Sequence, residues 1–586
     1  MGIYIFKIKY KSKGIFMNKN SDLQVLRHSA AHLLAHAVSE IFPDTQLTIG
    51  PATETGFFYD FLPTQNFKEE DLPVLEKRMH EIAARKLPLT HKEISKKEAC
   101  QLYKSNPFKL ELINGLEGET AGISEQGNFF DLCRGGHVAS TGDIKYFKLT
   151  SISGSYWRAD RSGTALQRIT GIAFLTQADM DEYLQHQEDV VKYDHRRLGK
   201  QLDLFSFQEE GVGFPFFHPK GKTVLNQLVM FMRSVLKKAD YLEIETPIML
   251  SDELWKRSGH YEFYKNNMYF SVIDEKNYAV KPMNCPGSIL IYKDRPRSYR
   301  ELPMRLFEFG KVHRHELSGV LHGLFRVRTF TIDDTHMYCT HEQIEEVILV
   351  SIKNLMMVMN TFGFDEVKVG LSTKPANAMG TDEFWQKAIN GLKSGLEKAG
   401  VAYVVQEGEG AFYGPKIEFK IKDSMNREWQ CGTIQLDLLQ PENFDLNYVS
   451  AGGTLKRPVI IHQAIFGSLE RFFAVLLEHH KGHLPFWLAP VQAVLLTITD
   501  DQKEYARALA EQLKNAGIRV EIDETSDTIS GKIKTAQLQK TPWMLVMGKK
   551  EVQNNTVTLR YADGSQKDGI SQEALISLAK SLIPSM

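Results

Sequence analysis

Apolar residues recur every three or four positions in the first part of the chain, which is the spacing of an amphipathic helix. The pattern predicts helices over residues 26–41 and 69–84, with short strand-like runs between and after them. Residues 177–201 (QADMDEYLQHQEDVVKYDHRRLGKQ) are mostly polar or charged, and we expect one long helix there. Such a helix would connect this region to the next.

The pattern changes in the middle of the chain. From Leu204 to about Trp487, runs rich in aromatic and β-branched residues alternate with Gly and Pro turns and with helices such as 221–239. This is typical of an α+β domain with a large antiparallel sheet. The remaining C-terminal residues begin with AVLLTIT and then alternate helices and strands, which predicts a small α/β domain with a mostly parallel sheet.

Composition narrows the class of protein. At roughly 150 residues per domain, 586 residues predict several domains, and 42% hydrophobic with 24% charged residues exclude a mostly disordered chain. Lys and Arg (71) balance Asp and Glu (72), so any RNA binding must come from local basic patches. Five cysteines without a CxxC pair favour a reducing compartment. No membrane span or signal peptide is evident, so we expect a cytoplasmic protein.

Histidines and a cysteine near the N-terminus suggest chemistry. His28, His32 and His36 recur every fourth position and would share one face of a helix. The segment lacks the glutamate of the HExxH pattern, which disfavours a metalloprotease. Cys133 and His137 lie beside a Gly-Gly turn further along. Each one alone fits a structural role better than a functional one. Together, two histidine pairs and a cysteine are equally compatible with a zinc site or a metal-free hydrolytic pocket.

A second group is spread over three segments of the middle region. Cys285 lies in a Pro-bounded turn, His336 follows two aspartates, and His462 lies at the end of an apolar strand. One cysteine and two histidines would leave the fourth position of a tetrahedral zinc open to a substrate, as catalytic sites require. Spacing alone does not decide this, because structural roles explain each residue and Cys339 competes as the thiolate ligand.

Arginines gather between these segments. Arg314, Glu316, Arg326 and Arg328 flank a Gly-containing loop that joins two strand-like runs. Arginines at a hairpin suit a polyphosphate, because bidentate contacts fix its orientation and neutralise its charge. A solvated hairpin held by salt bridges is the alternative. Arg471 follows a strand within a predicted helix, either at a pocket floor or on the helix surface.

Several segments together resemble one enzyme family. YLEIETPIML, HRHELSG with FRVRTF, and RPVIIHQAIFGSLERF are similar to the three motifs of class II aminoacyl-tRNA synthetases. Segments similar to threonyl-tRNA synthetases are RHSAAHLLAHA with DLCRGGH, GPATETGFFYDF, LWKRSGHYEFY, MNCPG, AFYGPKIEF and WQCGTIQLD. The resemblance begins at about Ser21 and runs to the end of the chain. It implies a threonine-tRNA ligase that forms threonyl-adenylate with ATP, charges tRNA(Thr), and hydrolyses seryl-tRNA(Thr).

The resemblance also implies an α+β multidomain fold. A class II antiparallel-sheet catalytic domain is expected together with an α+β editing domain and a C-terminal α/β anticodon-binding domain. The expected boundaries are a tail at 1–20 in place of the family's usual extra N-terminal domain, an editing domain with linker helix at 21–193, a catalytic domain at 194–486, and an anticodon-binding domain at 487–586. The segment around Pro247 resembles the motif that forms the subunit interface, which implies a homodimer.

The resemblance assigns roles in the catalytic domain. Arg314 would hold the α-phosphate of ATP and Arg471 the γ-phosphate, while Phe330 would stack on adenine. Glu316 and Arg326 would support the nucleotide, which is expected with Mg²⁺. One Zn²⁺ per subunit would be bound by Cys285, His336 and His462, and Asp334 would accept a hydrogen bond from the threonine hydroxyl. Other residues expected to line this cavity are His260, Tyr413, Lys416, Gln430 and Gln435.

The first cluster matches the family's editing pocket. An apolar pocket separates valine from threonine by only ~10²-fold, whereas a metal that ligates the amino and hydroxyl groups leaves valine one contact short. Serine keeps both groups, so a second, hydrolytic site is needed. The resemblance implies that this site acts without a catalytic zinc and consists of His28, His32, Cys133, His137 and Asp131.

Two features depart from the family pattern. Ile332 stands where the family often has Gln, so a hydrogen-bond donor is missing near the expected substrate site. Residues 491–586 carry 12 Lys and Arg and 12 Asp and Glu, so the expected tRNA-binding domain has no net charge. These features, with the missing N-terminal domain, motivate an alternative: a specialised paralogue that charges another acceptor or confers inhibitor resistance. A non-catalytic regulator with a synthetase fold is a further alternative.

Overall fold

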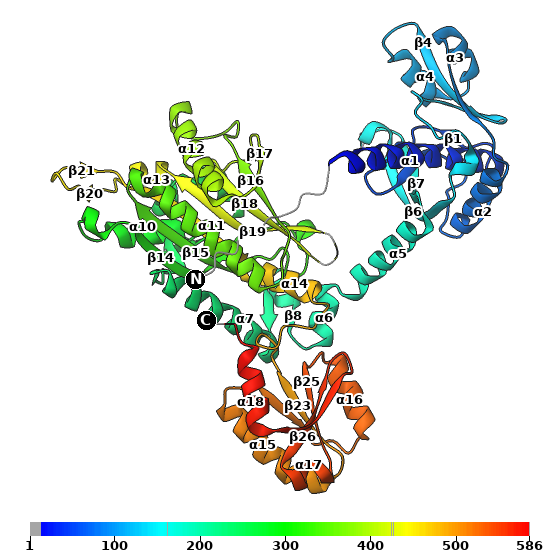
Figure 1. Cartoon of the computed structure of the whole chain (residues 1–586). Helices are drawn as coiled ribbons and strands as arrows, with labels where there is room; N and C mark the ends of the chain where they lie inside the picture. Colours follow the sequence, from blue (N-terminus) through cyan, green and yellow to red (C-terminus); the bar gives the residue numbers. More distant parts are fainter. Residues whose placement is uncertain (1–12, 161, 424, 426, 585–586) are drawn as a thin grey trace. The chain divides into compact units, whose positions relative to one another are not determined.

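The computed structural model describes residues 13–160, 162–423, 425 and 427–584. Of the predicted tail, residues 1–12 lie outside this set. The chain divides into two compact units (Figure 1). The first unit ends at Glu188, and the second begins at Asp189; each is described by itself below. The domain boundaries expected from the resemblance stay predictions. Among the described helices, none has the length and apolar character needed to cross a membrane.

The first unit is built on a four-stranded sheet with the order β1-β2-β7-β6. Its strands are β1 (Gln46–Leu47), β2 (Phe57–Leu62), β6 (Tyr146–Tyr156) and β7 (Ala165–Phe174). Helix α1 (Lys13–Ile41) includes the predicted helix 26–41, and α2 (Asp71–Ala84) lies within the predicted 69–84. Both pack on this sheet. The apolar positions of α1, such as Leu33 and Leu34, are buried in the same core as Phe57 and Phe61 of β2.

A smaller layer completes this unit. It is a three-stranded sheet of β3 (Leu89–Ser95), β4 (Thr120–Gln126) and β5 (Phe129–Leu132), covered by α3 (Lys96–Leu102) and α4 (Pro107–Asn114). Its own core contains Ile123 and Ile113. This layer presents the segment that follows β5 toward α1, which becomes important for the site described below.

The second unit contains an eight-stranded sheet with the order β10-β14-β15-β22-β19-β18-β16-β17. The central pairs are antiparallel, and each edge strand is parallel to its neighbour. The strands are β10 (Leu242–Glu243), β14 (Met304–His313), β15 (Thr329–Cys339), β16 (Val367–Ser372), β17 (Val404–Gln406), β18 (Lys416–Lys422), β19 (Glu428–Asp437) and β22 (Val459–Ser468). The predicted large antiparallel sheet is therefore confirmed.

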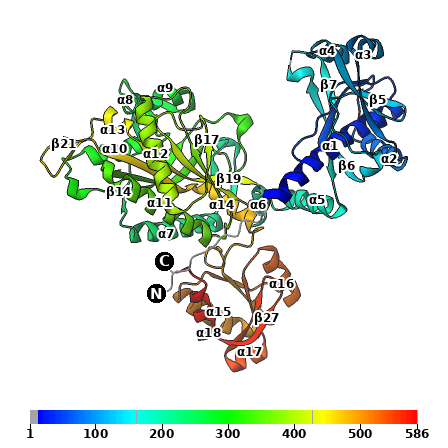
Figure 2. The ribbon, with the colours of Figure 1, turned by 45° about the horizontal axis from the view of Figure 1, so that its top comes forward.

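Helices cover one face of this sheet (Figures 1 and 2). They are α7 (Pro219–Lys238), α11 (Ile344–Thr361), α12 (Asp382–Ala399) and α14 (Leu469–His479). Residues such as Met337 and Ile461 point into the resulting core. Because successive side chains of a strand point to opposite faces, their neighbours His336 and His462 lie on the other face.

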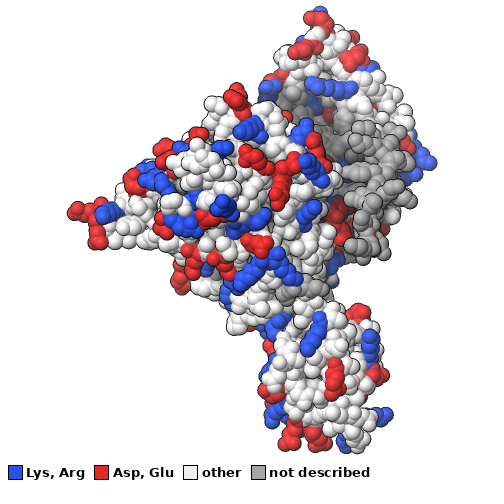
Figure 3. Space-filling model, turned by 60° about the vertical axis from the view of Figure 1, so that its left-hand side comes forward, with Lys and Arg blue, Asp and Glu red and all other residues white. Residues whose placement is uncertain are grey.

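The C-terminal part has a five-stranded sheet with the order β24-β23-β25-β26-β27. Its strands are β23 (Ala493–Thr497), β24 (Val520–Asp523), β25 (Trp543–Met547), β26 (Thr556–Tyr561) and β27 (Gln566–Ser571), and its helices include α15 (Lys503–Asn515), α16 (Ile529–Leu538) and α18 (Gln572–Ser581). The first three strands are parallel as predicted, and two antiparallel strands extend them. Every residue of β23 is buried because α15 and α18 cover one face and α16 the other. Figure 3 shows acidic and basic side chains interspersed on the visible surface of this part.

The predicted single helix over 177–201 is wrong. The structure has α5 (Gln177–Lys192) and a separate α6 (His195–Gln201). Asp194 lies between them in an extended conformation (φ −53°, ψ 130°), and its carboxylate accepts a hydrogen bond from the Arg196 N–H at 2.8 Å. Asp194 is therefore the N-cap of a new helix, and polar composition alone conceals this break.

Candidate active sites

Cys285, His336 and His462 form one of two His/Cys clusters among the described residues. Their ligand atoms all lie within 4.8 Å of one another, and all three residues are buried. Among the described residues, neither ring nitrogen of His336 has a hydrogen-bond partner. His462 Nε2 lies 3.0 Å from Asp437 Oδ2, a carboxylate contact that orients the ring and leaves Nδ1 available. A thiol and two imidazoles, one of which has no hydrogen-bond partner, suit Zn²⁺.

The sheet register explains how such scattered residues meet. His336 of β15 is directly opposite His462 of β22, which in turn is opposite Gln435 of β19. Gln435 is opposite Lys416 of β18. Four predicted site residues therefore form one row across four strands, and Cys285 joins them from the N-terminus of α10 (Cys285–Lys293). Cys339, the competing thiolate, is buried in the helix-covered core.

A cavity of about 570 Å³ lies over this row. The predicted site residues in its lining are Cys285, Arg314, Asp334, His336, Tyr413, Lys416, Gln435 and His462. Tyr413 donates a hydrogen bond to Gln435 Oε1 at 2.7 Å. Ile332 also lines the cavity, so the departure from the family pattern affects the cavity wall.

Two predicted pocket residues lie just behind this lining. His260 is fully buried, and its Nδ1 lies 2.8 Å from Ser258 Oγ, while its ring lies beside that of Tyr413. Gln430 donates to Glu418 at 2.8 Å, and the same carboxylate pairs with Lys416 at 2.6 Å. These contacts support the wall rather than form it.

Asp334 has a partner that the sequence did not indicate. Asn284, the residue before Cys285, donates to Asp334 Oδ2 at 3.1 Å. Burial raises the pKa of Asp334 to about 6, and the nearby His462 and Asn284 counteract this. Asn284 lies within the MNCPG segment, and its closeness in sequence to Cys285 was the available signal.

The arginine loop lies beside the cavity. The Arg314 guanidinium lies 5.2 Å from the centre of the Phe330 ring, and Arg326 pairs with Glu316 at 3.0 Å. Arg471 Nε donates to the Phe325 carbonyl at 3.0 Å. Arg328 instead donates to the backbone carbonyls of Glu316 and Val212, which is the structural role expected of a hairpin arginine.

Two buried carboxylates fix the turn before α14. Asp333 accepts hydrogen bonds from the backbone N–H groups of Ile465, Phe466 and Gly467 at 3.0, 2.8 and 2.9 Å. Glu470 accepts the Thr331 N–H with both carboxylate oxygens. The strand that carries Asp334 is thereby tied to the helix that carries Arg471. Neither carboxylate was predicted, because TIDD and SLERF show no sign of which acid points inward.

The second cluster lies in the first unit. Cys133 Sγ lies 3.2 Å from His137 Nε2 and 3.5 Å from His28 Nε2, and His32 belongs to the same group. Burial alone would raise the pKa of the Cys133 thiol, but hydrogen bonds from the three histidines outweigh it and lower that pKa to about 2. The cluster therefore holds a thiolate beside imidazole groups.

His36 does not join this cluster, although the spacing suggested a shared face. Its ring stacks on Phe129 with centroids 5.0 Å apart, and its Nε2 lies 3.3 Å from Glu40. The face of a helix drifts as it advances, so the third histidine of the series meets different neighbours. His36 therefore has a structural role, packing on Phe129 and contacting Glu40, and is not part of the cluster.

Asp131 belongs to a buried network that includes two unpredicted residues. Lys109 Nζ lies 2.5 Å from Asp131 Oδ1, and Tyr59 donates to Asp131 Oδ2 at 2.6 Å. His32 Nδ1 lies 3.5 Å from the same carboxylate. A cavity of about 560 Å³ is lined by His28, His32, Lys109, Asp131 and Cys133. Lys109 gave no signal in the sequence, because a single lysine is usually a surface residue.

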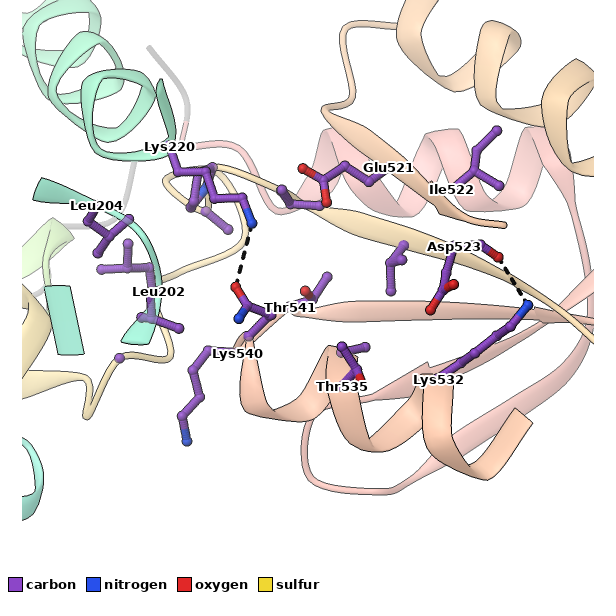
Figure 4. Close-up of a pocket in the computed structure, with 18 of the residues that line it drawn as sticks. Leu202, Leu204, Lys220, Glu521, Ile522, Asp523, Lys532, Thr535, Lys540 and Thr541 are labelled. Carbon is purple, nitrogen blue, oxygen red and sulfur yellow. Dashed lines mark hydrogen bonds between the residues drawn. The ribbon is translucent and has the colours of Figure 1, made fainter. Parts of the chain in front are cut away.

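A further cavity of about 280 Å³ is lined by residues of both the C-terminal part and the segments near Leu204 (Figure 4). Its buried Lys532 donates to the Asp523 carbonyl at 3.1 Å and to the Thr497 carbonyl at 3.2 Å. Lys220 lies 3.5 Å from Gln539 at the other end. These polar groups satisfy one another, which indicates packing between elements rather than chemistry.

Three segments of the chain match known protein families. The class II tRNA synthetase core domain (G, H, P, S and T) matches residues 269–480, an anticodon binding domain matches 492–582, and the threonyl and alanyl tRNA synthetase second additional domain matches 123–170. The threonine-tRNA ligase of Clostridium tetani is 52% identical over 549 residues, which cover 93% of this chain and 85% of that protein. The chain belongs to the threonine-tRNA ligase family.

Further members of the threonine-tRNA ligase family are similar to this chain in sequence and in structure. The enzyme of Desulfosudis oleivorans is 49% identical over 95% of this chain and 87% of its own. A crystal structure of the RNA binding domain of threonyl-tRNA synthetase from Cryptosporidium parvum superposes with a TM-score of 0.65 at 43% identity, covering 66% of this chain and 98% of that one. The predicted fold class, the aminoacyl-tRNA ligase activity and the presence of an editing domain are confirmed.

Proposed function

We propose that the cluster of Cys285, His336 and His462 binds one Zn²⁺ and selects threonine for activation. The observation that carries this proposal is a fully buried His336 whose ring nitrogens lack hydrogen-bond partners within the described structure, next to a cysteine and a second histidine. When bound, the zinc would act as a Lewis acid that ligates the amino and hydroxyl groups of the amino acid. Asp334 accepts the hydrogen bond of the threonine hydroxyl.

The arginine loop binds ATP. Arg314 holds the α-phosphate, Arg471 holds the γ-phosphate, and Phe330 stacks on adenine, with Glu316 and Arg326 supporting the nucleotide. The threonine carboxylate attacks the α-phosphorus, and diphosphate leaves with its Mg²⁺. The guanidinium groups offset the negative charge that develops, and the row of residues over the sheet keeps the carboxylate near its target.

The second cluster removes serine that has been attached to tRNA(Thr). The Cys133 thiolate and the imidazoles of His28, His32 and His137 bind and orient the seryl ester and a water molecule, and Asp131 holds His32. Cys133 contacts His28 and His137, and Asp131 lies 3.5 Å from His32 Nδ1; as in the family's editing pocket, these groups act in our proposal without a metal. A chelator should therefore leave deacylation of seryl-tRNA intact while abolishing threonine activation.

We further propose a cytoplasmic homodimer. Leu242, Ile248 and Met249, in the segment that resembles the class II interface motif, expose between 43% and 62% of their surface in the single chain. Exposed apolar residues close together favour a protein interface. All five cysteines are unpaired, which fits a reducing compartment. Sedimentation of the purified protein at micromolar concentration tests the dimer.

The decisive experiment is exchange of pyrophosphate into ATP with threonine, serine or valine, with and without a zinc chelator, followed by charging of tRNA(Thr). Zinc-dependent exchange with threonine and serine but not valine, together with charging, supports the proposal. Exchange without charging supports a specialised paralogue, which the apolar Ile332 and the absence of net charge in the C-terminal domain favour. Exchange that survives complete zinc removal contradicts the zinc assignment.

A further inference from the structure

His195 is fully buried at the start of α6, and both of its ring nitrogens are engaged. Nδ1 lies 2.7 Å from Glu478 Oε1, and Nε2 lies 3.0 Å from the backbone nitrogen of Leu324. A backbone N–H can only donate, so His195 Nε2 accepts the hydrogen bond from Leu324. Nδ1 is therefore protonated and donates a hydrogen bond to Glu478. The tautomer of this histidine is thus fixed by its two neighbours.

Asp194, His195 and Glu478 lie close enough together to resemble a metal site. The hydrogen bonds give a different explanation. Glu478 also accepts the backbone N–H of His195 at 2.9 Å and pairs with Arg427. Because the lone pair of His195 Nε2 accepts the Leu324 N–H, neither ring nitrogen is free to bind a cation. Glu478 therefore fixes the orientation of a neutral His195 imidazole.

The loop between β14 and β15 is shaped to meet this imidazole. Gly323, directly before Leu324, has a positive φ of 49°. A Cβ at this position would lie 2.1 Å from His195 Nε2, far inside contact distance. The glycine thus serves two needs at once: the left-handed turn and the close approach of the ring to the backbone.

The neighbouring residue of the loop is held from other sides. The Phe325 ring stacks on Trp429 with centroids 3.8 Å apart and lies edge-on to His195 at 4.3 Å. Its carbonyl accepts the hydrogen bond from Arg471. His195 and Arg471 therefore form hydrogen bonds with the backbone of two adjacent loop residues, Leu324 and Phe325, which directly precede Arg326.

We propose that His195 is a positioning residue for ATP binding: it holds Leu324 and Phe325 so that Arg326 and Arg471 face the phosphates. The inference rests on the proposed role of this loop in binding ATP. His195 itself touches no substrate, because it lies buried beneath the loop. Burial lowers the pKa of His195 to about 4, so the ring stays neutral and its acceptor nitrogen stays available at neutral pH.

Two substitutions separate the two bonds. In His195→Asn the amide nitrogen replaces Nδ1 and can still donate to Glu478, but nothing reaches Leu324. In His195→Gln the longer amide places an oxygen near the position of Nε2. We expect the KM for ATP in pyrophosphate exchange to rise roughly tenfold in His195→Asn, the size expected when a buried N–H loses its acceptor, and to rise less in His195→Gln. The KM for threonine should stay unchanged in both.

His218→Asn is the matched control. His218 likewise has a carboxylate at Nδ1 (Asp203, 2.6 Å) and a second partner at Nε2 (Ser206, 3.0 Å), but these partners lie outside the loop. Its KM for ATP should equal that of the wild type. Equal KM values for ATP in the wild type and His195→Asn would overturn the proposal, as would a parallel rise of the KM for threonine.

Gly323→Ala supplies an independent test. It should raise the KM for ATP in the wild-type background and raise it less when combined with His195→Asn, because the shorter side chain removes the closest contact of the new methyl group. The contact with Arg196 Cγ at 2.8 Å and the left-handed φ remain in both backgrounds. Purely additive effects would contradict the contact. A wild-type enzyme without threonine-dependent exchange would instead contradict the proposed function, so the two failures are distinguishable.

Discussion

The turn before α14 offers a prediction whose size follows from counted hydrogen bonds. In Asp333→Asn the side chain keeps its shape, but one carboxylate oxygen becomes an NH₂ group. The better amide orientation keeps the oxygen on Ile465 and Phe466 and turns the NH₂ toward the N–H of Gly467. One charge-assisted bond is lost and one N–H is left facing a donor, which together cost about 3 kcal/mol.

Burial raises the pKa of Asp333 to about 7, so urea denaturation of the full chain well above this pH, followed by tryptophan fluorescence, measures the loss with the carboxylate ionised. We expect a lower transition midpoint for the unit that contains the large sheet, with an unchanged slope. Asp274→Asn is the control, since Asp274 is exposed in a turn, and it should shift stability by less than about 0.5 kcal/mol. An Asp333→Asn protein as stable as the control would refute the view that this carboxylate holds the turn.

Three further outcomes are expected. Cys285→Ser should lose bound zinc, measured by elemental analysis, together with threonine-dependent exchange, whereas Cys339→Ser should keep both. Lys109→Met leaves Asp131 buried without its cation, so deacylation of seryl-tRNA should fall while threonine activation is retained. Because the pKa of His195 is about 4 when folded and near 6.5 when unfolded, the unfolded chain binds the extra proton between these values, and stability falls as pH falls through them. Between pH 7 and 5 the wild type should lose about 2 kcal/mol more than His195→Asn.

The sequence predicted the sheets and long helices well, because burial of one face imposes a clear period on apolar residues. It did not predict the break at Asp194, since a capping residue inside a polar stretch leaves that period unchanged. Cys285, His336 and His462 could be assigned to one site only through the family resemblance. Their proximity depends on the register between β15 and β22, which spacing along the chain does not encode.

The supporting residues were the hardest to predict. Lys109 and His195 act by being buried against specific partners, although lysine is usually exposed and His195 lies in a polar segment. Burial of a polar residue is decided by tertiary packing, so a single sequence gives little warning of it. His36 shows the opposite error, because a regular spacing suggested a shared role that its actual neighbours do not support.

The row of residues across four strands limits which changes in chain length the enzyme tolerates. Inserting or deleting one residue within β15 or β22 would send His336 or His462 to the helix-covered face and bring an apolar neighbour to the cavity. Each strand could still pair, so the protein could fold while losing its ligands. Length variation among relatives should therefore fall in the connecting loops, and a one-residue indel inside these strands would mark a member that no longer activates threonine.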